Sequence, residues 1–565
     1  MISAFVLMAA LAVPGADETR ESVFESFADL TPQGKIDQLV FERLQRLGIQ
    51  PAGVCSDSVF VRRAYLDVIG TLPTMHEARE FLADQDPDKR RALIDRLLSR
   101  EEFADYWAMK WSDLLRVKAE FPINLWPNAA QAYYRWIRGS IRDNLPYDRF
   151  VREMLVANGS NFRVPQVNFY RAIQVKKPQT VAQAVALTFM GVRAEKWPKE
   201  RLAGMAAFFS QIGYKSTGEW KEEIVSFDPT KATAQTGDPV PDTAVFPDET
   251  SVKLPPGRDP RAVFADWLIA PKNRWFARNV VNRVWSWLLG RGIIHEPDDI
   301  REDNPPSNAE LLAYLEQELV AARYDLKHIY RLILNSKTYQ LSSIPKTDTP
   351  QAAAHFAHYP LRRLEAEVLI DALCQITGTT ERYSSIIPEP FTHIPENQRS
   401  IALPDGSITS SFLEQFGRPS RDTGFESERN SRPTAEQRLH LLNSGHIRRK
   451  IEQGPNLPAL MQSGAEPREV ANVLYLTILS RLPTEEEWAI VKAYAKTRGE
   501  GELEYVAKPS AKPGKPAKAK PSTTSRKEEA DGARSRPQPV RVRGRETLMD
   551  LAWALINSTE FLCRH

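Results

Sequence analysis

The sequence predicts a mainly α-helical protein with two helical domains, few short strands and a disordered basic linker. Three observations support this: apolar residues recur at helical spacing, capping boxes precede several segments, and alternating strand patterns are rare. The chain has 565 residues, enough for more than one sizeable core. With 42% hydrophobic and 26% charged residues it has a globular composition, and no apolar run supports multi-pass membrane insertion.

Amphipathic helices are predicted along most of the chain. The first, at 36–47, has apolar residues at positions i, i+3, i+4 and i+7. Similar patterns predict helices at 92–98, 311–321, 326–334, 364–376, 469–479 and 546–561. Capping boxes, which satisfy otherwise unpaired backbone N–H groups, predict helix starts at Thr74, Ser307, Thr434 and Thr484. Short strands are predicted only at 252–254 and 400–403.

The N-terminus has the pattern of an export signal. Residues 4–13 are apolar, and Pro14, Gly15 and Ala16 follow before the first acidic residues. This order is typical of a secretory segment with a small-residue cleavage site. We therefore expect residues 1–16 to be a signal peptide or an anchor, and the protein to be exported, periplasmic or associated with the cell envelope. Because no basic residue precedes the apolar run, both forms of the segment stay open.

A strongly basic segment lies near the C-terminus. Between Lys508 and Arg545 the sequence has twelve Lys or Arg and three Asp or Glu, whereas the whole chain has a net charge of only +3. Such a composition buries too little apolar surface to fold, which predicts a disordered insert at 506–545. The insert could contact an anionic polymer by charge. It contains no aromatic residue for base stacking, so specific nucleic-acid binding is not predicted.

Composition also predicts the domain boundaries. A segment rich in Pro, Asp, Thr and Lys, at 226–258, is expected to be a linker between a helical domain at 17–225 and a second one. The second domain is expected to comprise 259–505 and 546–565, because a strong helical pattern resumes after the basic insert. We expect this last helix to pack against the helices that precede the insert.

Two groups of polar residues are candidates for binding. The first group is Asn282, Arg283, Arg291, Asp298 and Asp299, whose amides, guanidinium groups and carboxylates would suit a sugar or an oxygen-ligated cation. An alternative is that they form buried hydrogen bonds that orient a corner of the chain. The second group is Glu428, Arg429 and Asn430, in a polar loop before a capped helix, where binding sites concentrate.

Catalysis and cofactor binding receive less support from the sequence. A glycan-acting hydrolase or lyase would need two carboxylates in one cleft, roughly 5–10 Å apart, drawn from Asp298, Asp299, Glu365 and Glu428. The helix face that carries Glu365, Glu367 and Asp371 is expected to form ion pairs, for example between Arg363 and Glu367. His355 and His358 lack a third metal ligand, and Trp107 and Trp111 are expected to lie in the core. We therefore predict no catalytic residue, no metal and no cofactor.

Several motifs resemble a known family. Residues 59–111 resemble the N-terminal domain of exported cytochrome-like proteins that are abundant in planctomycetes. Residues 259–343 resemble the planctomycete-specific C-terminal domain that usually follows it, through the runs NRVW at 282–285, GRG at 290–292 and PDD at 297–299. The resemblance covers most of 36–565 apart from the linker and the insert. Both domains are of unknown function in that family.

The chain departs from this family at its haem motif. Relatives carry a CxxCH motif between a Gly-Val-Arg run and a Trp, whereas here only three residues separate Arg193 from Trp197. The three cysteines, Cys55, Cys374 and Cys563, form no CxxC pair, and a thioether-linked haem needs two nearby thiols. The resemblance thus implies a member without the haem motif. We expect a non-redox binding or scaffolding protein of the cell envelope rather than an enzyme, with an exported protein or a polysaccharide as its partner.

Overall fold

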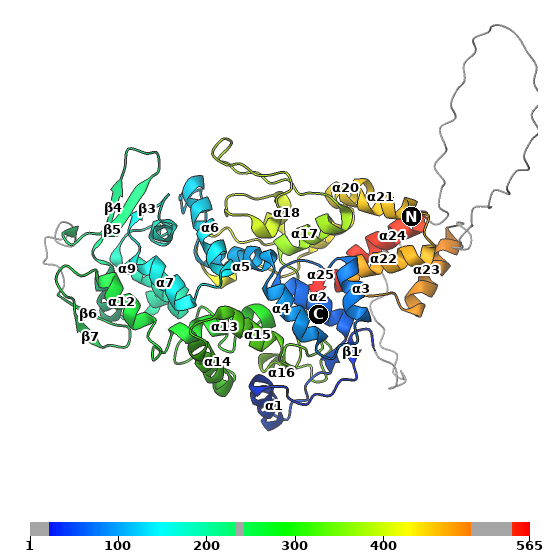
Figure 1. Cartoon of the computed structure of the whole chain (residues 1–565), viewed down its shortest axis with the longest axis horizontal. Coiled ribbons are helices and arrows are strands. Elements are labelled where there is room, and N and C mark those ends of the chain that lie inside the picture. Colours follow the sequence, from blue (N-terminus) through cyan, green and yellow to red (C-terminus); the bar gives the residue numbers. More distant parts are fainter. Residues whose placement is uncertain (1–21, 232–241, 499–544) are drawn as a thin grey trace, which may run out of the picture.

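Helices dominate the structure, as the sequence predicts. The computed structural model describes residues 22–231, 242–498 and 545–565, and the molecule is elongated (Figure 1). The helices of the N-terminal part are α1 (Lys35–Arg46), α2 (Asp57–Val68), α3 (Met75–Ala83), α4 (Lys89–Leu98), α5 (Glu101–Leu114), α6 (Pro127–Arg142), α7 (Tyr147–Val156), α8 (Asn168–Arg171), α9 (Pro178–Val185) and α10 (Lys199–Ala206).

The C-terminal part continues in the same way. Its helices are α12 (Pro260–Leu268), α13 (Phe276–Leu289), α14 (Ala309–Ala321), α15 (Leu326–Leu334), α16 (Pro350–Ala354), α17 (Ala366–Thr377), α18 (Ser411–Gln415), α19 (Ala435–Asn443), α20 (Gly445–Gln453), α21 (Asn456–Gln462), α22 (Pro467–Leu479), α23 (Glu485–Thr497), α24 (Arg545–Ile556) and α25 (Thr559–Leu562).

The strands are short and all pair in antiparallel fashion. They are β1 (Glu25–Ser26) with β2 (Val54–Cys55), β3 (Gly159–Ser160) and β4 (Ile212–Ser216) on either side of β5 (Glu223–Phe227), β6 (Thr243–Val245) with β7 (Ser251–Lys253), and β8 (Arg362–Arg363) with β9 (Cys563–Arg564). The β8–β9 pair brings the end of the chain beside α17, and α24 packs against α22 and α23. The expected return of the last helix is confirmed.

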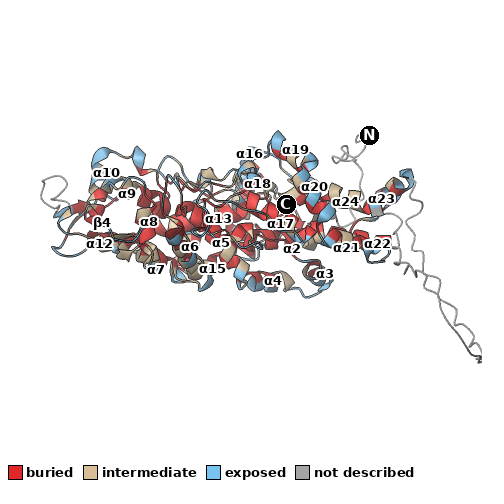
Figure 2. Ribbon diagram, turned by 90° about the horizontal axis from the view of Figure 1, so that it is seen from above, coloured by how far each residue is buried: buried red, intermediate tan, exposed pale blue. Residues whose placement is uncertain are grey.

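Four helices form the centre of the core. Helices α2, α5, α13 and α17 are buried on nearly every side, as expected for helices without a polar face. Figure 2 shows the buried residues along the middle of the molecule, with exposed residues on the outer helices. Trp107 and Trp111 of α5 are buried, and their rings lie 5.3 and 5.7 Å from that of Trp287, which confirms their place in the core.

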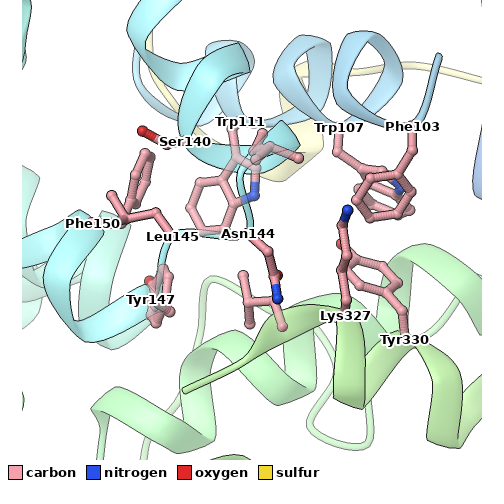
Figure 3. Close-up of a pocket in the computed structure, with 12 residues that line it drawn as sticks. Phe103, Trp107, Trp111, Ser140, Asn144, Leu145, Tyr147, Phe150, Lys327 and Tyr330 are labelled. Atoms are coloured by element: carbon pink, nitrogen blue, oxygen red, sulfur yellow. The ribbon is translucent and has the colours of Figure 1, made fainter. Parts of the chain in front are cut away.

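A narrow cavity adjoins these tryptophans. Figure 3 shows Trp107 and Trp111 above the rings of Tyr147 and Tyr330, which come from α7 and α15. The cavity volume is about 30 Å³, room for roughly two water molecules. Such a space holds no prosthetic group, so the aromatic cluster contributes packing.

Both predicted domains contribute to one continuous apolar core. Buried residues from Ile36 to Phe561 belong to the same cluster. The guanidinium group of Arg62 donates hydrogen bonds to the carbonyl oxygens of Ile478 and Phe561 at 2.8 and 2.7 Å, so α2 is tied to α22 and α25. The predicted linker at 226–258 includes the β6–β7 hairpin, whose Phe246 stacks on Phe208 of the N-terminal part. The domain boundaries themselves stay predictions.

The local predictions have mixed outcomes. Thr74, Thr434 and Thr484 form the expected capping boxes, and the strand at 252–254 corresponds to β7. The helix start at Ser307 is wrong by one residue, because the side chain of Asn308 caps α14. The strand at 400–403 is also wrong. Residues Ser400–Ala402 form a 3-10 turn, because the Asp371 carboxylate accepts hydrogen bonds from the backbone N–H groups of Ser400 and Ile401.

Two predictions fall largely outside the described residues. The export segment at 1–16 and nearly all of the basic insert at 506–545 lie there. Within the described ranges, no helix combines the length and the apolar character that crossing a bilayer requires.

Candidate functional site

Asn282 of α13 holds the chain that returns after this helix. Its side-chain oxygen accepts a hydrogen bond from the Ile294 backbone N–H at 2.8 Å, and its side-chain nitrogen donates to the Ile294 carbonyl at 2.9 Å. The return passes so close that a Cβ atom on Gly292 would lie 2.2 Å from the Ile294 oxygen. The oxygen and the nitrogen of the Asn282 side chain therefore both form hydrogen bonds that orient this corner.

Arg283, one residue further along α13, lies in a buried ion-pair cluster. Its guanidinium group contacts Asp298 at 2.8 Å and Glu426 at 3.4 Å, and both Arg283 and Asp298 are almost fully buried. Asp298 also accepts a hydrogen bond from the Glu426 backbone N–H at 2.6 Å. Burial alone would lower the pKa of Arg283, but the charges of Asp298 and Glu426 outweigh it and raise the pKa. The structure thus brings Arg283 and Asp298 together.

Arg429 lies at the centre of a second buried cluster. Its guanidinium group contacts Glu367 of α17 at 2.7 and 3.0 Å and Asp113 of α5 at 2.7 and 3.2 Å. Asp113 also binds Arg421 at 2.9 Å, and Glu367 lies 3.5 Å from Arg418. Burial would raise the pKa of Glu367, but Arg429 and Arg418 hold it at about 2. We call the clusters of Arg283 and Arg429, together with the buried pair of Lys110 and Glu365 at 2.7 Å, the charge lattice.

Glu428 and Asn430 order the loop that carries Arg429. The Glu428 carboxylate accepts hydrogen bonds from the Ser420 and Thr423 hydroxyls and from two backbone N–H groups at 422 and 423. The Asn430 backbone N–H donates to the Gly417 carbonyl at 3.0 Å. Gly417 has φ +84°, and a Cβ atom there would lie 1.8 Å from the Asn430 carbonyl oxygen, so only glycine fits. Both residues therefore stabilise the loop.

The two remaining predicted residues lie apart from these clusters. Asp299 pairs with Arg301 at 3.1 Å near the surface. Arg291, in the turn after α13, makes no hydrogen bond or ion pair with any described residue. The structure therefore separates the first predicted group into a corner, an ion-pair cluster and an unpaired cation.

Several residues of the charge lattice were missed by sequence reasoning. Lys110 and Asp113 lie on α5, more than 250 positions from their partners Glu365 and Arg429. The predicted pair of Arg363 with Glu367 is wrong, because Arg363 donates to the carbonyl oxygens of Ser431 and Phe416. For Lys110 and Asp113, the only available signal was a charged residue in an otherwise apolar helix, because such a charge needs a buried partner.

The four carboxylates proposed for acid–base catalysis are engaged separately. Glu365 binds Lys110 at 2.7 Å and also Arg564, and these charges hold its pKa well below the ordinary value against the effect of burial. The hydrogen bonds to Glu428 lower its pKa as well, again against burial. Both groups are thus ionised and hydrogen-bonded. Among the described residues, no interaction joins any two of Asp298, Asp299, Glu365 and Glu428.

The fold and the charge lattice define a mainly helical protein whose N-terminal and C-terminal parts meet through buried ion pairs. Two family models match these same parts: residues 35–210 match PSCyt2, a protein of unknown function (DUF1549), and residues 260–495 match PSD1, a protein of unknown function (DUF1553). The chain belongs to the planctomycete cytochrome-like family that joins these two domains. No curated protein and no solved structure matches the chain.

The Arg429 cluster and the pair of Lys110 and Glu365 lie where the two matched regions meet, whereas the Arg283 cluster lies within the second region. Lys110 and Asp113 belong to the first region, and Glu365, Glu367 and Arg429 belong to the second. Breaking a buried ion pair by removing one partner costs about 3–5 kcal/mol. The ion pairs between the two regions therefore fix how the regions are oriented relative to each other.

Proposed function

We propose that the protein is an exported, non-redox binding or scaffolding protein of the cell envelope. The apolar N-terminal segment and the family support export. The wide separation of Cys55, Cys374 and Cys563 in the sequence supports a role without thioether-linked haem. The saturation of the candidate carboxylates by cations and hydrogen bonds favours binding over acid–base catalysis by them.

An exposed aromatic surface is the observation that carries the binding role. We define the aromatic surface as Phe121, Trp126, Trp220, Ile386 and Phe391. Phe121, Trp220, Ile386 and Phe391 are 85%, 67%, 87% and 50% exposed. The Trp126 ring contacts two of these side chains, since its centroid lies 6.3 Å from that of Trp220 and 5.4 Å from that of Phe391. Contiguous exposed apolar side chains of this size mark interaction sites.

Three separate segments build this surface, and hydrogen bonds fix two of them together. Phe121 and Trp126 lie between α5 and α6, Trp220 lies in the β4–β5 turn, and the rest follows α17 (Figure 1). The Glu120 carboxylate accepts hydrogen bonds from the Ile386 N–H at 3.0 Å and from the Ser385 hydroxyl at 3.1 Å. Because the loops are held in place, little conformational entropy would be lost on binding.

A protein segment fits this surface better than a polysaccharide. A groove of about 310 Å³ begins two residues after Phe391, between α6 and residues 393–408. Its lining combines polar Gln131, Arg135, His393 and Gln398 with apolar Ile394, Pro395, Leu403, Pro404 and Ile408. Sugar rings stack on aromatic faces but gain little from aliphatic and proline side chains. Aromatic anchors beside a partly apolar groove are instead typical of the energetic centre of a protein–protein interface.

Crosslinking in envelope extracts tests this role. Full-length wild-type protein, a Trp220→Ser/Phe391→Ser variant and a Phe27→Ser control would each be crosslinked and recovered. Phe27 is 64% exposed but follows β1, so its variant removes an exposed aromatic ring that lies outside the aromatic surface. We expect the wild type and the control to recover the same defined protein, and the double variant to recover at least ten times less.

Two outcomes would contradict the proposal. Equal recovery of that protein by the double variant would show that the aromatic surface is not its docking site. Recovery of a polysaccharide without a protein would favour the other partner class. The alternative of a glycan-acting hydrolase or lyase, with Asp298, Asp299, Glu365 or Glu428 as acid and base, predicts instead the release of reducing ends or unsaturated products from envelope polysaccharide.

The basic insert at 506–545 adds a separate proposal. Its excess of Lys and Arg suits an anionic envelope polymer. Deletion of 506–545 should then reduce retention of the protein in the envelope at low salt, and unchanged retention would remove this role.

A further inference from the structure

Two arginines in the described part of the chain differ from those of the charge lattice. Neither the guanidinium group of Arg43, on α1, nor that of Arg291, in the turn after α13, has a hydrogen-bond or ion-pair partner among the described residues. The Nε atoms of both are buried, so water does not replace the missing partner there. A half-buried cation with unused donors is costly unless a ligand satisfies it.

The elements that carry these arginines converge on one place. The chain after α1 is joined to the chain after α16 by a hydrogen bond from the Ala52 N–H to the Ala357 carbonyl at 2.8 Å. The last turns of α13 meet the same segment, because the Trp285 ring packs edge-on against Phe356 with centroids 5.1 Å apart. His355, beside Phe356, therefore lies between the ends of α1 and α13.

His355 has the same lack of partners. Its Nδ1 atom is buried and makes no hydrogen bond. Burial lowers the pKa of His355, and the positive charges of Arg43 and Arg291 lower it further. Hydrogen bonds also join the segments of the two arginines: the Asn308 side chain donates to the Leu39 carbonyl, one turn before Arg43, at 3.0 Å, and the Ser307 N–H donates to the Ile293 carbonyl, two residues after Arg291, at 2.8 Å. No carboxylate opposes them at His355, whereas Asp348 does so at the neighbouring His358.

The electrostatics of this group is therefore the opposite of that of the charge lattice. We call Arg43, Arg291 and His355 the cationic cluster. Two guanidinium groups supply planar, multiple N–H donors with a geometry that matches the oxygen atoms of an anion, and a neutral imidazole supplies one more. Tetrahedral oxyanions of sulfate and phosphate accept several such bonds at once, and their charge offsets the surplus positive charge.

We propose that Arg43, Arg291 and His355 form a binding site for the oxyanion of a sulfate or phosphate ester. The two arginines bind the oxygen atoms, and His355 donates one further hydrogen bond. The site is distinct from the aromatic surface, and it holds whether or not that surface docks a protein.

Calorimetric titration of the full chain tests the site directly. Inorganic sulfate and inorganic phosphate are titrated separately into the wild type at constant ionic strength, because screening would otherwise mimic competition. We expect saturable binding of one oxyanion per chain. Arg43→Gln and Arg291→Gln should each weaken it at least tenfold, since a charge-assisted hydrogen bond is lost in each variant.

Arg46→Gln is the matched control. Arg46 lies on the same helix as Arg43 and loses the same charge, but it already pairs with Glu310 at 3.2 Å and with Glu42 at 3.7 Å. Its variant should bind the oxyanion within about twofold of the wild type. Arg291→Lys keeps the charge but loses the planar donors, and should bind several-fold more weakly than the wild type.

Defined outcomes would overturn the proposal. These are the absence of saturable binding of either ion, binding that persists unchanged in Arg43→Gln and Arg291→Gln, and equal weakening in Arg46→Gln. Dextran sulfate and a polyphosphate then identify the carrier. Tighter binding of one polymer than of its free ion, lost in Arg291→Gln, would establish an ester as the ligand, whereas tighter binding of the free ions would overturn the ester part of the proposal.

Discussion

The charge lattice and the cationic cluster both contain buried or half-buried arginines, but only those of the lattice are paired with carboxylates. In the lattice, Arg429 contacts two carboxylates and Arg283 contacts two others, all at least half buried. In the cationic cluster, Arg43 and Arg291 contact no carboxylate of the described residues. Burial makes an unmatched charge costly, so a saturated cluster contributes to stability while an unsaturated one is poised for a ligand. The difference shows that charge balance, rather than residue type, separates structural from binding arginines here.

Removal of Arg429 should have the largest effect. Arg429→Met leaves the carboxylates of Asp113 and Glu367 with fewer buried partners. We expect the free energy of unfolding to fall by about 3–5 kcal/mol, as for other broken buried pairs. Denaturant unfolding monitored by circular dichroism measures it. Arg46→Met, which breaks exposed pairs, should cost no more than about 1 kcal/mol. A similar small loss in Arg429→Met would mean that the lattice is not structural.

Acid should have the second-largest effect on the stability that the charge lattice provides. The pKa of Glu367 is about 2 in the folded protein, below its ordinary value of 4.5. The folded state therefore favours the ionised form, so this contribution is complete well above pH 4.5 and is lost as the pH falls toward 2. Between pH 7 and pH 3 the expected loss from this group is about 2 kcal/mol.

A Glu367→Gln variant separates this contribution from other titrating groups. The variant should be less stable than the wild type at pH 7, and its unfolding free energy should depend less steeply on pH in the acid range. Denaturant midpoints at several pH values between 7 and 3 give both slopes. Parallel curves for the two proteins would contradict the role assigned to Glu367.

The third-largest loss of stability is expected when the corner held by Asn282 is disrupted. Asn282→Ala removes two buried hydrogen bonds to Ile294 and leaves both backbone groups without partners. The expected loss of stability is about 2 kcal/mol. Asn456→Ala, which removes one exposed hydrogen bond to Gln375, should change the stability by no more than about 0.5 kcal/mol. Equal melting temperatures of the two variants would show that the corner does not depend on this side chain.

The sequence predicted the helices more accurately than it predicted which residues contact each other within the fold. Hydrophobic periodicity identified α1, α14, α15, α17 and α22, because each buries one continuous set of apolar residues. Local signals failed where distant residues decide the structure. Residues 400–403 have strand-forming character, but Asp371 of α17 binds two of their N–H groups and bends them into a turn.

The candidate site was predictable only in part, for the same reason. Arg283 and Asp298 were recognised as a polar group within one motif, and they do contact each other. Asp113 and Arg429 lie more than 300 positions apart, and no spacing in the sequence relates them. Arg43 resembles the surface residue Arg46 in the sequence, since both follow the polar pattern of α1; only the structure separates the paired one from the unpaired one.

The smallest expected effect is the sharpest test of the comparison. Because Arg291 has no described partner, Arg291→Gln should leave the unfolding free energy within about 0.5 kcal/mol of the wild type, or raise it. Sulfate at ten times its dissociation constant should then stabilise the wild type by about 1.4 kcal/mol and the variant by no more than about 0.4 kcal/mol. Thermal unfolding with and without sulfate, at matched ionic strength, measures both quantities. A large loss of stability in Arg291→Gln without ligand would mean that this arginine is structural, like those of the charge lattice.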